Sequence, residues 1–111
     1  MNAYEIPNLR FSLPAGGEVT RHRFVAVNTD GHGIQANATA HIVGASMNQT
    51  KAGEVLEVAD GIVMVEAAGA VEAGKAAYAD ANGKVTGTGT VVAGVVITSA
   101  TEGGLAAVKI N

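Results

Sequence analysis

The sequence has no cysteine, no tryptophan, only two prolines, and few aromatic residues for a chain of 111. Without cysteine, no disulfide and no thiolate metal site can stabilise the chain. Its 48% of hydrophobic residues are largely alanine and valine, and it contains 15 glycines. Fully burying a valine contributes roughly 1.5–3 kcal/mol and alanine much less, whereas a glycine inside an element costs about 0.5–1 kcal/mol relative to alanine. The expected core is thin, so we expect stabilisation by subunit contacts.

Charge of either sign is also scarce, with seven Lys and Arg against ten Asp and Glu and a net charge of −3. Only Arg21, His22 and Arg23 form a basic group, far short of the cationic stripe that nucleic-acid binding needs. There is no run of about 18 apolar residues, which a membrane span would need. Residues 1–5 lack the basic and apolar segments of a secretory signal. We therefore expect one domain, made in a cytoplasm, that binds neither nucleic acid nor membrane.

What the sequence does contain is a succession of short apolar segments cut by glycine-containing turns. Asp60-Gly61 is expected to turn, and so is the segment 80–83, where Gly83 takes a positive φ. At most a turn or two of helix fits near 36–40 or 49–51. The pattern predicts an all-β fold, a small β-sandwich or β-barrel-like roll with little or no helix. The expected strands are 10–13, one within 18–28, 34–36, 38–46, 54–59, 62–66, 76–79, 84–86, 91–98 and 105–110.

The first nine residues show neither helical nor strand periodicity, and Pro7 interrupts them. They form either a frayed terminus or an extended N-terminal arm that docks on a partner. In the second interpretation Tyr4, Ile6 and Leu9 are apolar anchors, and Phe11 packs where the arm meets the body. The chain then divides into an arm over 1–9 and a single β-rich domain over 10–111.

A repeated spacing of residues suggests internal duplication. Gly53 follows Gly44 by nine residues, and Val58 follows five later. Gly94, Gly103 and Val108 have the same spacing, and Asp30-Gly31 and Asn82-Gly83 precede the two sets. In a glycine-rich chain the match arises either by chance or from a repeat. As a repeat it predicts two similar β-units of about fifty residues packed as halves of one roll.

Residues that carry catalysis or bind metal are few. No serine lies in a Gly-x-Ser-x-Gly elbow. His22, His32 and His41 are spaced too widely to place two imidazoles on one face, and no calcium-loop pattern occurs. Gly87 to Thr90 lacks the Gly-Lys-Ser/Thr ending of a phosphate-binding loop. We expect no enzyme and no catalytic, cofactor or metal site.

Two other function classes need residues that are missing here. Biotin and lipoate carriers present a lysine at a hairpin tip, as Lys84 would be. Those families flank the lysine with Met or with Asp-Lys-Ala, and neither occurs here. A carbohydrate-binding or host-attachment module displayed on a surface would need exposed aromatic rings. The only candidates are Tyr4, Phe11, Phe24 and Tyr78.

Taken in order, several stretches resemble the capsid cement (head decoration) proteins of tailed bacteriophages. Individually these are unspecific glycine and valine patterns, and their ordered succession over about residues 10–111 carries the resemblance, with the arm outside it. They are AGGEV at 15–19, RFVAV at 23–27, IVGA at 42–45, AGEV at 52–55, GIVMVE at 61–66, VEAGK at 71–75, and the closing Gly-x-Gly, Ala-Gly-Val and Val-Lys-Ile pieces.

The resemblance implies a structural virion protein without an active site, made in the host bacterial cytoplasm. Such proteins bind the outer surface of the mature capsid, bridge neighbouring major capsid subunits and hold the shell against internal DNA pressure. The implied partners are the major capsid protein and further copies of the chain, with a homotrimer favoured over a homodimer. The contact residues we expect are Tyr4, Ile6, Leu9 and Phe11, joined by exposed loops such as 29–33.

Overall fold

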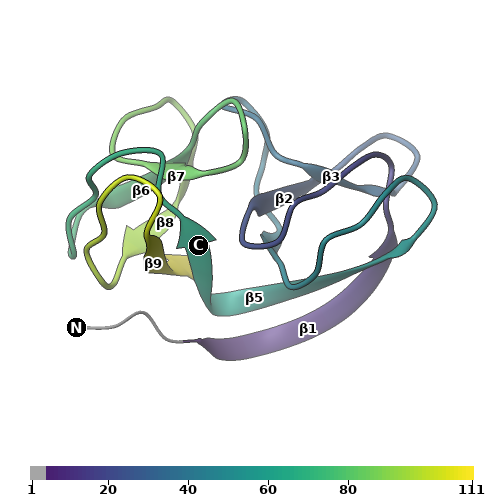
Figure 1. Ribbon diagram of the computed structural model, residues 1–111, viewed down its shortest axis with the longest axis horizontal. Coiled ribbons are helices and arrows are strands. Elements are labelled where there is room, and N and C mark those ends of the chain that lie inside the picture. Colours follow the sequence, from purple (N-terminus) through teal and green to yellow (C-terminus); the bar gives the residue numbers. More distant parts are fainter. Residues whose placement is uncertain (1–4) are drawn as a thin grey trace.

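The computed structural model describes residues 5–111, and these residues contain strands and loops but no helix (Figure 1). The predicted all-β fold is therefore confirmed. The nine strands are β1 (Ile6–Pro14), β2 (Phe24–Val27), β3 (Gly33–Gln35), β4 (Gly44–Ser46), β5 (Val55–Glu66), β6 (Ala76–Ala79), β7 (Val85–Thr86), β8 (Val92–Val96) and β9 (Leu105–Ile110).

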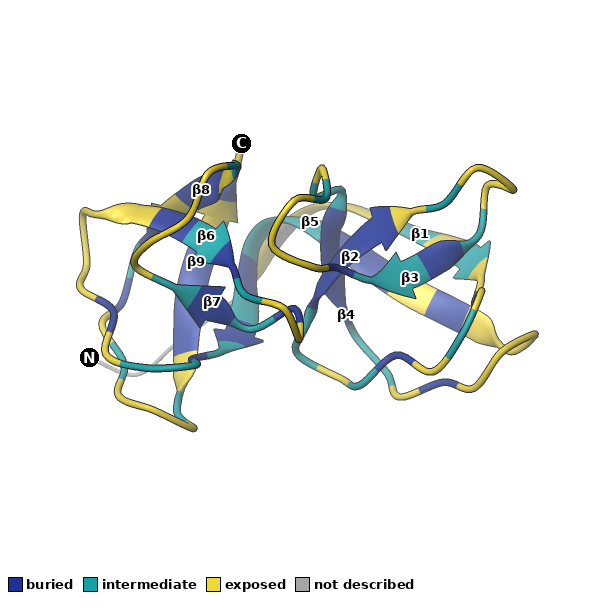
Figure 2. Cartoon of the chain, turned by 90° about the horizontal axis from the view of Figure 1, so that it is seen from above, coloured by how far each residue is buried: buried dark blue, intermediate teal, exposed yellow. Residues whose placement is uncertain are grey.

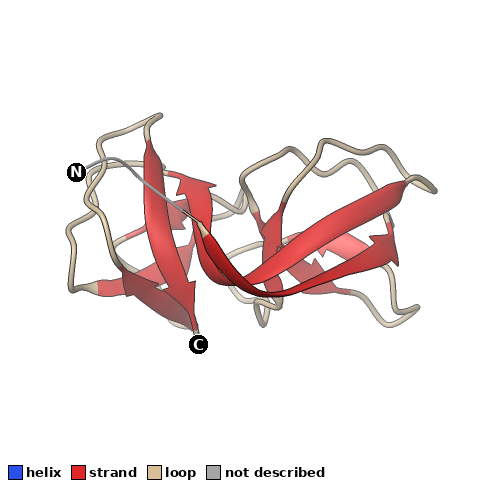
Figure 3. Cartoon of the chain, turned by 90° about the horizontal axis from the view of Figure 1, so that it is seen from below, coloured by secondary structure: helices blue, strands red, loops and turns tan. Residues whose placement is uncertain are grey.

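All nine strands belong to one antiparallel, strongly curled sheet. Its order is β3-β2-β4-β5-β9-β8-β6-β7, and β1 pairs with β5 beside this path. Strand β5 is the longest at 12 residues. Its first half pairs with β1 and β4, and its second half pairs with β9. The twisted ribbon of β1 and β5 therefore links the two ends of the molecule (Figure 3).

The internal repeat is real. Unit 1 (residues 10–60) and unit 2 (residues 62–111) have the same pairing scheme, because β2 pairs with β3 and β4 just as β6 pairs with β7 and β8. In each unit a parallel bridge closes the curl, and an antiparallel bridge joins two loops. The matching bridges are Ala15–Gly33 with Ala67–Val85, and Val19–Thr50 with Val71–Ala100. Equivalent residues are 52 positions apart up to β3 and β7, and 50 apart from β4 and β8 onward.

The prediction of a turn at Asp60-Gly61 is wrong, because both residues lie inside β5. Gly61 has a φ of 108°, and a Cβ there would lie 2.5 Å from the backbone nitrogen of Asn8. The register of β1 shifts at this point, between Pro7 and Leu9. The glycine thus serves a bulge in the neighbouring strand, which is a second common reason for glycine in a strand.

Two further strand boundaries differ from the sequence prediction. Strand β1 begins at Ile6, so residues 6–9 pair with β5 instead of preceding the first strand. Strand β4 covers Gly44–Ser46 and not the segment around Ile42. Val43 still donates its N–H to the Val25 carbonyl at 2.9 Å, so pairing continues irregularly ahead of the strand. No helical turn forms at 36–40, where the Asn37 side chain accepts the N–H of Thr39 in a local turn.

The core consists of two clusters, and the larger one contains residues of both units. Figure 2 shows buried strand segments in both halves of the molecule. The smaller cluster fills unit 1 with buried Leu56, Val58 and Val25 and half-buried Phe11. The larger cluster fills unit 2 and includes Phe24, Ala45 and Ala59 from the outer face of unit 1. Unit 1 therefore buries both faces of its sheet, one inside itself and one against unit 2.

A turn of unit 2 makes direct backbone contact with unit 1. The N–H of Phe24 donates to the Gly83 carbonyl at 2.8 Å, and the N–H of Glu66 donates to the His22 carbonyl at 3.0 Å. Gly83 has the positive φ that the sequence predicted, with a value of 75°, and it is buried. A Cβ there would lie 3.0 Å from Gln35 Cγ and 3.2 Å from the Phe24 carbonyl oxygen, so a side chain would crowd the contact with unit 1 and strain the positive φ.

Replacing Gly94 by alanine tests the close packing of the strands. The new Cβ would overlap the Lys109 carbonyl of the neighbouring strand β9. The backbones must separate to accept it, so we expect Gly94→Ala to lower the free energy of unfolding by about 2–4 kcal/mol, measured by urea denaturation. Gly69→Ala is the control, because that position has no atom within 4 Å of a Cβ. Equal effects of the two substitutions would contradict the packing argument.

His22 provides a test of the repeat itself. It has a positive φ of 64°, and its counterpart in unit 2 is Gly74 with a φ of 86°. The buried Nδ1 of His22 also lacks a hydrogen-bond partner within the described part of the chain. Glycine adopts this conformation without strain, so His22→Gly should raise the free energy of unfolding by about 0.5–1 kcal/mol. In the reverse direction, Gly74→Ala should lower it, and thermal unfolding of both variants checks the pair.

Candidate functional site

The polar side chains of residues 5–111 form no group suited to metal binding or acid–base chemistry. No three His, Cys, Asp or Glu residues of this range lie close enough to hold a metal ion. His22 precedes β2, His32 lies in the turn between β2 and β3, and His41 lies in the loop before β4. Nor does this range contain a helix that could cross a membrane.

The aromatic side chains offer no exposed platform over the described range. Phe24 is fully buried, and Phe11 and Tyr78 are half-buried. Tyr4 lies outside the described residues. Sugar-binding surfaces stack rings on exposed aromatics, so nothing in this range favours a carbohydrate-binding module.

Two of the expected contact residues lie on the surface, and one lies inside. Ile6 is 60% exposed and Leu9 is 55% exposed, both on the first half of β1. Phe11 is half-buried and packs against the core of unit 1. Tyr4 falls outside the described range. The loop 29–33 was also expected to make contacts. Its residues 29–31 are exposed in the turn between β2 and β3, His32 is half-buried, and Gly33 is buried as the first residue of β3.

Ile6 lines an open cleft of about 330 Å³ where β1, β5 and β9 meet. The wall combines apolar side chains with the carboxylate of Asp60 and the amine of Lys109. Sequence reasoning missed this cleft, because its walls come from three segments far apart in the chain. They are Ile6, Asn8, Asp60, Gly61, Ile62, Lys109, Ile110 and Asn111.

One ion-pair network ties the two units together. Glu66 at the end of β5 accepts from Arg23 Nη2 at 3.1 Å and pairs with Lys84 Nζ at 3.3 Å. Arg23 also donates Nη1 to the Asn82 carbonyl at 3.3 Å. The hydrogen bond from Arg23, followed by that from Lys84, holds the pKa of Glu66 below its ordinary value, although partial burial opposes the shift.

The depressed pKa of Glu66 makes part of the stability depend on pH. The ionised carboxylate is favoured in the folded state, so its contribution is present above pH about 4.5 and fades as the pH falls below that value. We expect Glu66→Gln to lower the free energy of unfolding by about 1 kcal/mol at neutral pH and by less in acid. Glu72→Gln removes the same charge from an exposed loop and serves as the control. A loss for Glu66→Gln that stays constant into acid would refute this assignment.

Comparison with known proteins gives this surface a context. The phage cement protein family matches residues 5–110. The chain belongs to this family. The resemblance predicted from the sequence is thus confirmed, with one correction. The match begins at residue 5, so residues 5–9, which were expected to lie outside it, are included.

A solved structure shares the fold of this cement protein. The head fiber gp8.5 N base of bacteriophage phi29 superposes with a TM-score of 0.75, covering 93% of each chain at 19% identity. No curated protein sequence is similar enough to count as a relative. Family membership makes the chain a structural, non-enzymatic protein of the phage virion and implies association with the capsid.

Proposed function

We propose that this cement protein binds the outer surface of the mature capsid and bridges neighbouring major capsid subunits. By doing so it stabilises the shell against internal DNA pressure. The observation that carries the proposal is the family match over residues 5–110. Within that match, Ile6 and Leu9 expose apolar side chains at one end of β1, and Ile6 lines a cleft.

The N-terminal part of β1 has the properties of a contact surface. Ile6 and Leu9 are large exposed apolar side chains on the same strand, and Ile6 lines a cleft; both features are typical of protein interaction sites. Lys109 and Asp60 supply charged groups in the same cleft, where they can set the orientation of a partner. Tyr4, Ile6 and Leu9 act in this proposal as the anchors on the capsid, and Phe11 fixes β1 to unit 1.

Avidity supplies the preference for the mature shell. An oligomer that touches several capsid subunits completes all its contacts only when those subunits reach their mature spacing. It then binds the expanded state more tightly and shifts the capsid towards it. A specific contact of this kind buries on the order of 1,000 Å² or more. The thin Ala and Val core is consistent with an oligomer, and we favour a homotrimer over a homodimer.

Binding to heads tests the proposal directly. Purified protein is mixed with expanded heads that lack it, and with unexpanded precursor heads, and each is sedimented. We expect binding to expanded heads only, visible on the outer surface by electron microscopy. Replacing both Ile6 and Leu9 by Asp should weaken this binding by about tenfold or more, because charged groups would enter an apolar contact.

Val55→Asp is the matched control for the Ile6 and Leu9 double variant. Val55 is 61% exposed and lies at the opposite end of the β1–β5 pair, so it changes the same chemistry elsewhere. Unchanged binding by the double variant would rule out the N-terminal part of β1 as the contact. Failure of the unmodified protein to associate with heads at all would rule out the proposed function.

A further inference from the structure

The repeat shows which surface of unit 2 lacks the cover that unit 1 receives. In unit 1 a row of side chains runs across the outer face of the sheet, from β2 through β4 to β5. The paired residues are Phe24, Ala45 and Ala59, and all three are buried against unit 2. In unit 2 the row runs from β6 through β8 and β9 to β5, in the same register. Its residues are Ala76, Val95, Lys109 and Ile62.

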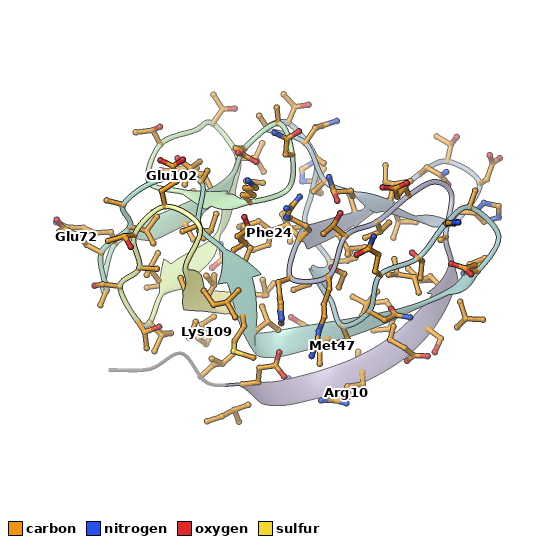
Figure 4. The ribbon with its side chains drawn as sticks, viewed as in Figure 1. Arg10, Phe24, Met47, Glu72, Glu102 and Lys109 are labelled. Atoms are coloured by element: carbon orange, nitrogen blue, oxygen red, sulfur yellow. The ribbon has the colours of Figure 1, made fainter. Side chains whose placement is uncertain are left out.

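These four residues form what we call the open face. Ala76, Val95 and Lys109 are far more accessible than their buried counterparts Phe24, Ala45 and Ala59, whereas Ile62 corresponds to the exposed Arg10. Val95 is 40% exposed, whereas its counterpart Ala45 is 1% exposed. Ala76 and Lys109 are exposed and Ile62 is half-buried. In Figure 4, Phe24 of unit 1 lies between the two halves of the molecule, and Lys109 of the open face lies at β9. The row is buried in unit 1 and accessible in unit 2, where apolar Ala76, Val95 and Ile62 lie beside Lys109, so it is a candidate contact surface for a neighbour.

The 80–84 turn, which covers the outer face of unit 1, has a counterpart in unit 1 that makes no such contact. The 80–84 turn of unit 2 contacts unit 1 through the Gly83 carbonyl. Its equivalent in unit 1 is the 28–32 turn, which has the same internal hydrogen bonds. The side chains of Asp80 and Asn28 each accept two backbone N–H groups of their own turn. Yet Gly83 is buried, whereas Gly31 is exposed and has no atom within 4 Å of a Cβ.

At the matching place, the backbone of the open face lacks the turn contact that Phe24 makes. Phe24 donates its N–H to Gly83. Its counterpart Ala76 makes no corresponding turn contact with any residue from 5 to 111.

The charges at these positions are also complementary. Inside the molecule Arg23 donates to the Asn82 carbonyl of the covering turn. The counterparts of these two residues are Lys75, next to the open face, and Asp30, in the free turn. Both are exposed, and neither forms an ion pair with any residue in the 5–111 range. A cation on one surface and an anion on the other favour their association.

From this equivalence we infer that the open face of one copy binds the 28–32 turn of a second copy, in the way that unit 1 binds the 80–84 turn. The contact is head-to-tail, because the turn and the face lie on different units of the chain. Such an interface leaves one turn and one face free on every growing assembly, so it closes into a ring or continues as a filament. The inference rests on the repeat and not on the proposed capsid binding, although Ile62 and Lys109 of the open face also line the cleft beside Ile6.

Charge reversal tests the contact in solution without any capsid. Sedimentation velocity over a wide range of protein concentration should show that the unmodified protein associates. Asp30→Lys and Lys75→Glu should each weaken the association by about tenfold. The double variant with both changes restores opposite charges and should recover to within about threefold of the unmodified protein. Lys51→Glu is the control and should associate normally, because it reverses the charge of an exposed lysine that belongs neither to the open face nor to the 28–32 turn.

Val95→Glu places a charge in the middle of the open face and should abolish association, while circular dichroism shows that the sheet is retained. The inference is overturned if the unmodified protein stays monomeric throughout, or if the double reversal fails to rescue the single ones. If the protein is monomeric and Lys75→Glu instead weakens binding to heads, the capsid protein occupies the face. That result would overturn the second-copy assignment and leave the proposed function intact.

Discussion

Strand β5 is the element on which both halves of this protein depend. Its first half closes unit 1 by pairing with β1 and β4, and its second half opens unit 2 by pairing with β9. Because one unbroken strand serves both units, their relative placement is fixed by backbone hydrogen bonds. Gly61 marks the change from one unit to the other, where the bulge in β1 leaves no room for a side chain.

The shared strand compensates for a core built from small side chains. Phe24 and Leu56 head the fully buried side chains by volume, and most of the others are valine and alanine. Unit 1 therefore gains stability by burying its outer face against unit 2, where Gly83 and Glu66 add hydrogen bonds and ion pairs. The equivalent face of unit 2 has no such cover and stays accessible. A structural protein of a capsid acts through the surfaces by which it contacts other proteins.

The predicted contact residues show how much of a protein's accessible apolar surface can be predicted from its sequence. The apolar character of Ile6 and Leu9 was visible in the sequence, and both are exposed. Phe11 has the same character but faces the core of unit 1. The open face escaped notice because Val95 and its neighbours have the alternation of any half-buried strand. Only the pairing of Val95 with Ala76 and Lys109 shows that they share one outer row.

The matching strand pairing of the two units established the duplication that the repeated glycine spacing had only suggested. The sequence by itself determined the all-β class, the turn at 80–83 and the family, since each depends on local patterns or on ordered motifs. It could not determine that Asp60-Gly61 continues a strand, because glycine suits a bulge as well as a turn. Nor could it reveal that equivalent rows of the two units differ in burial. Burial depends on what packs against a surface, and for Phe24 that neighbour is a turn nearly sixty residues away, at Gly83. Only the tertiary structure decided this.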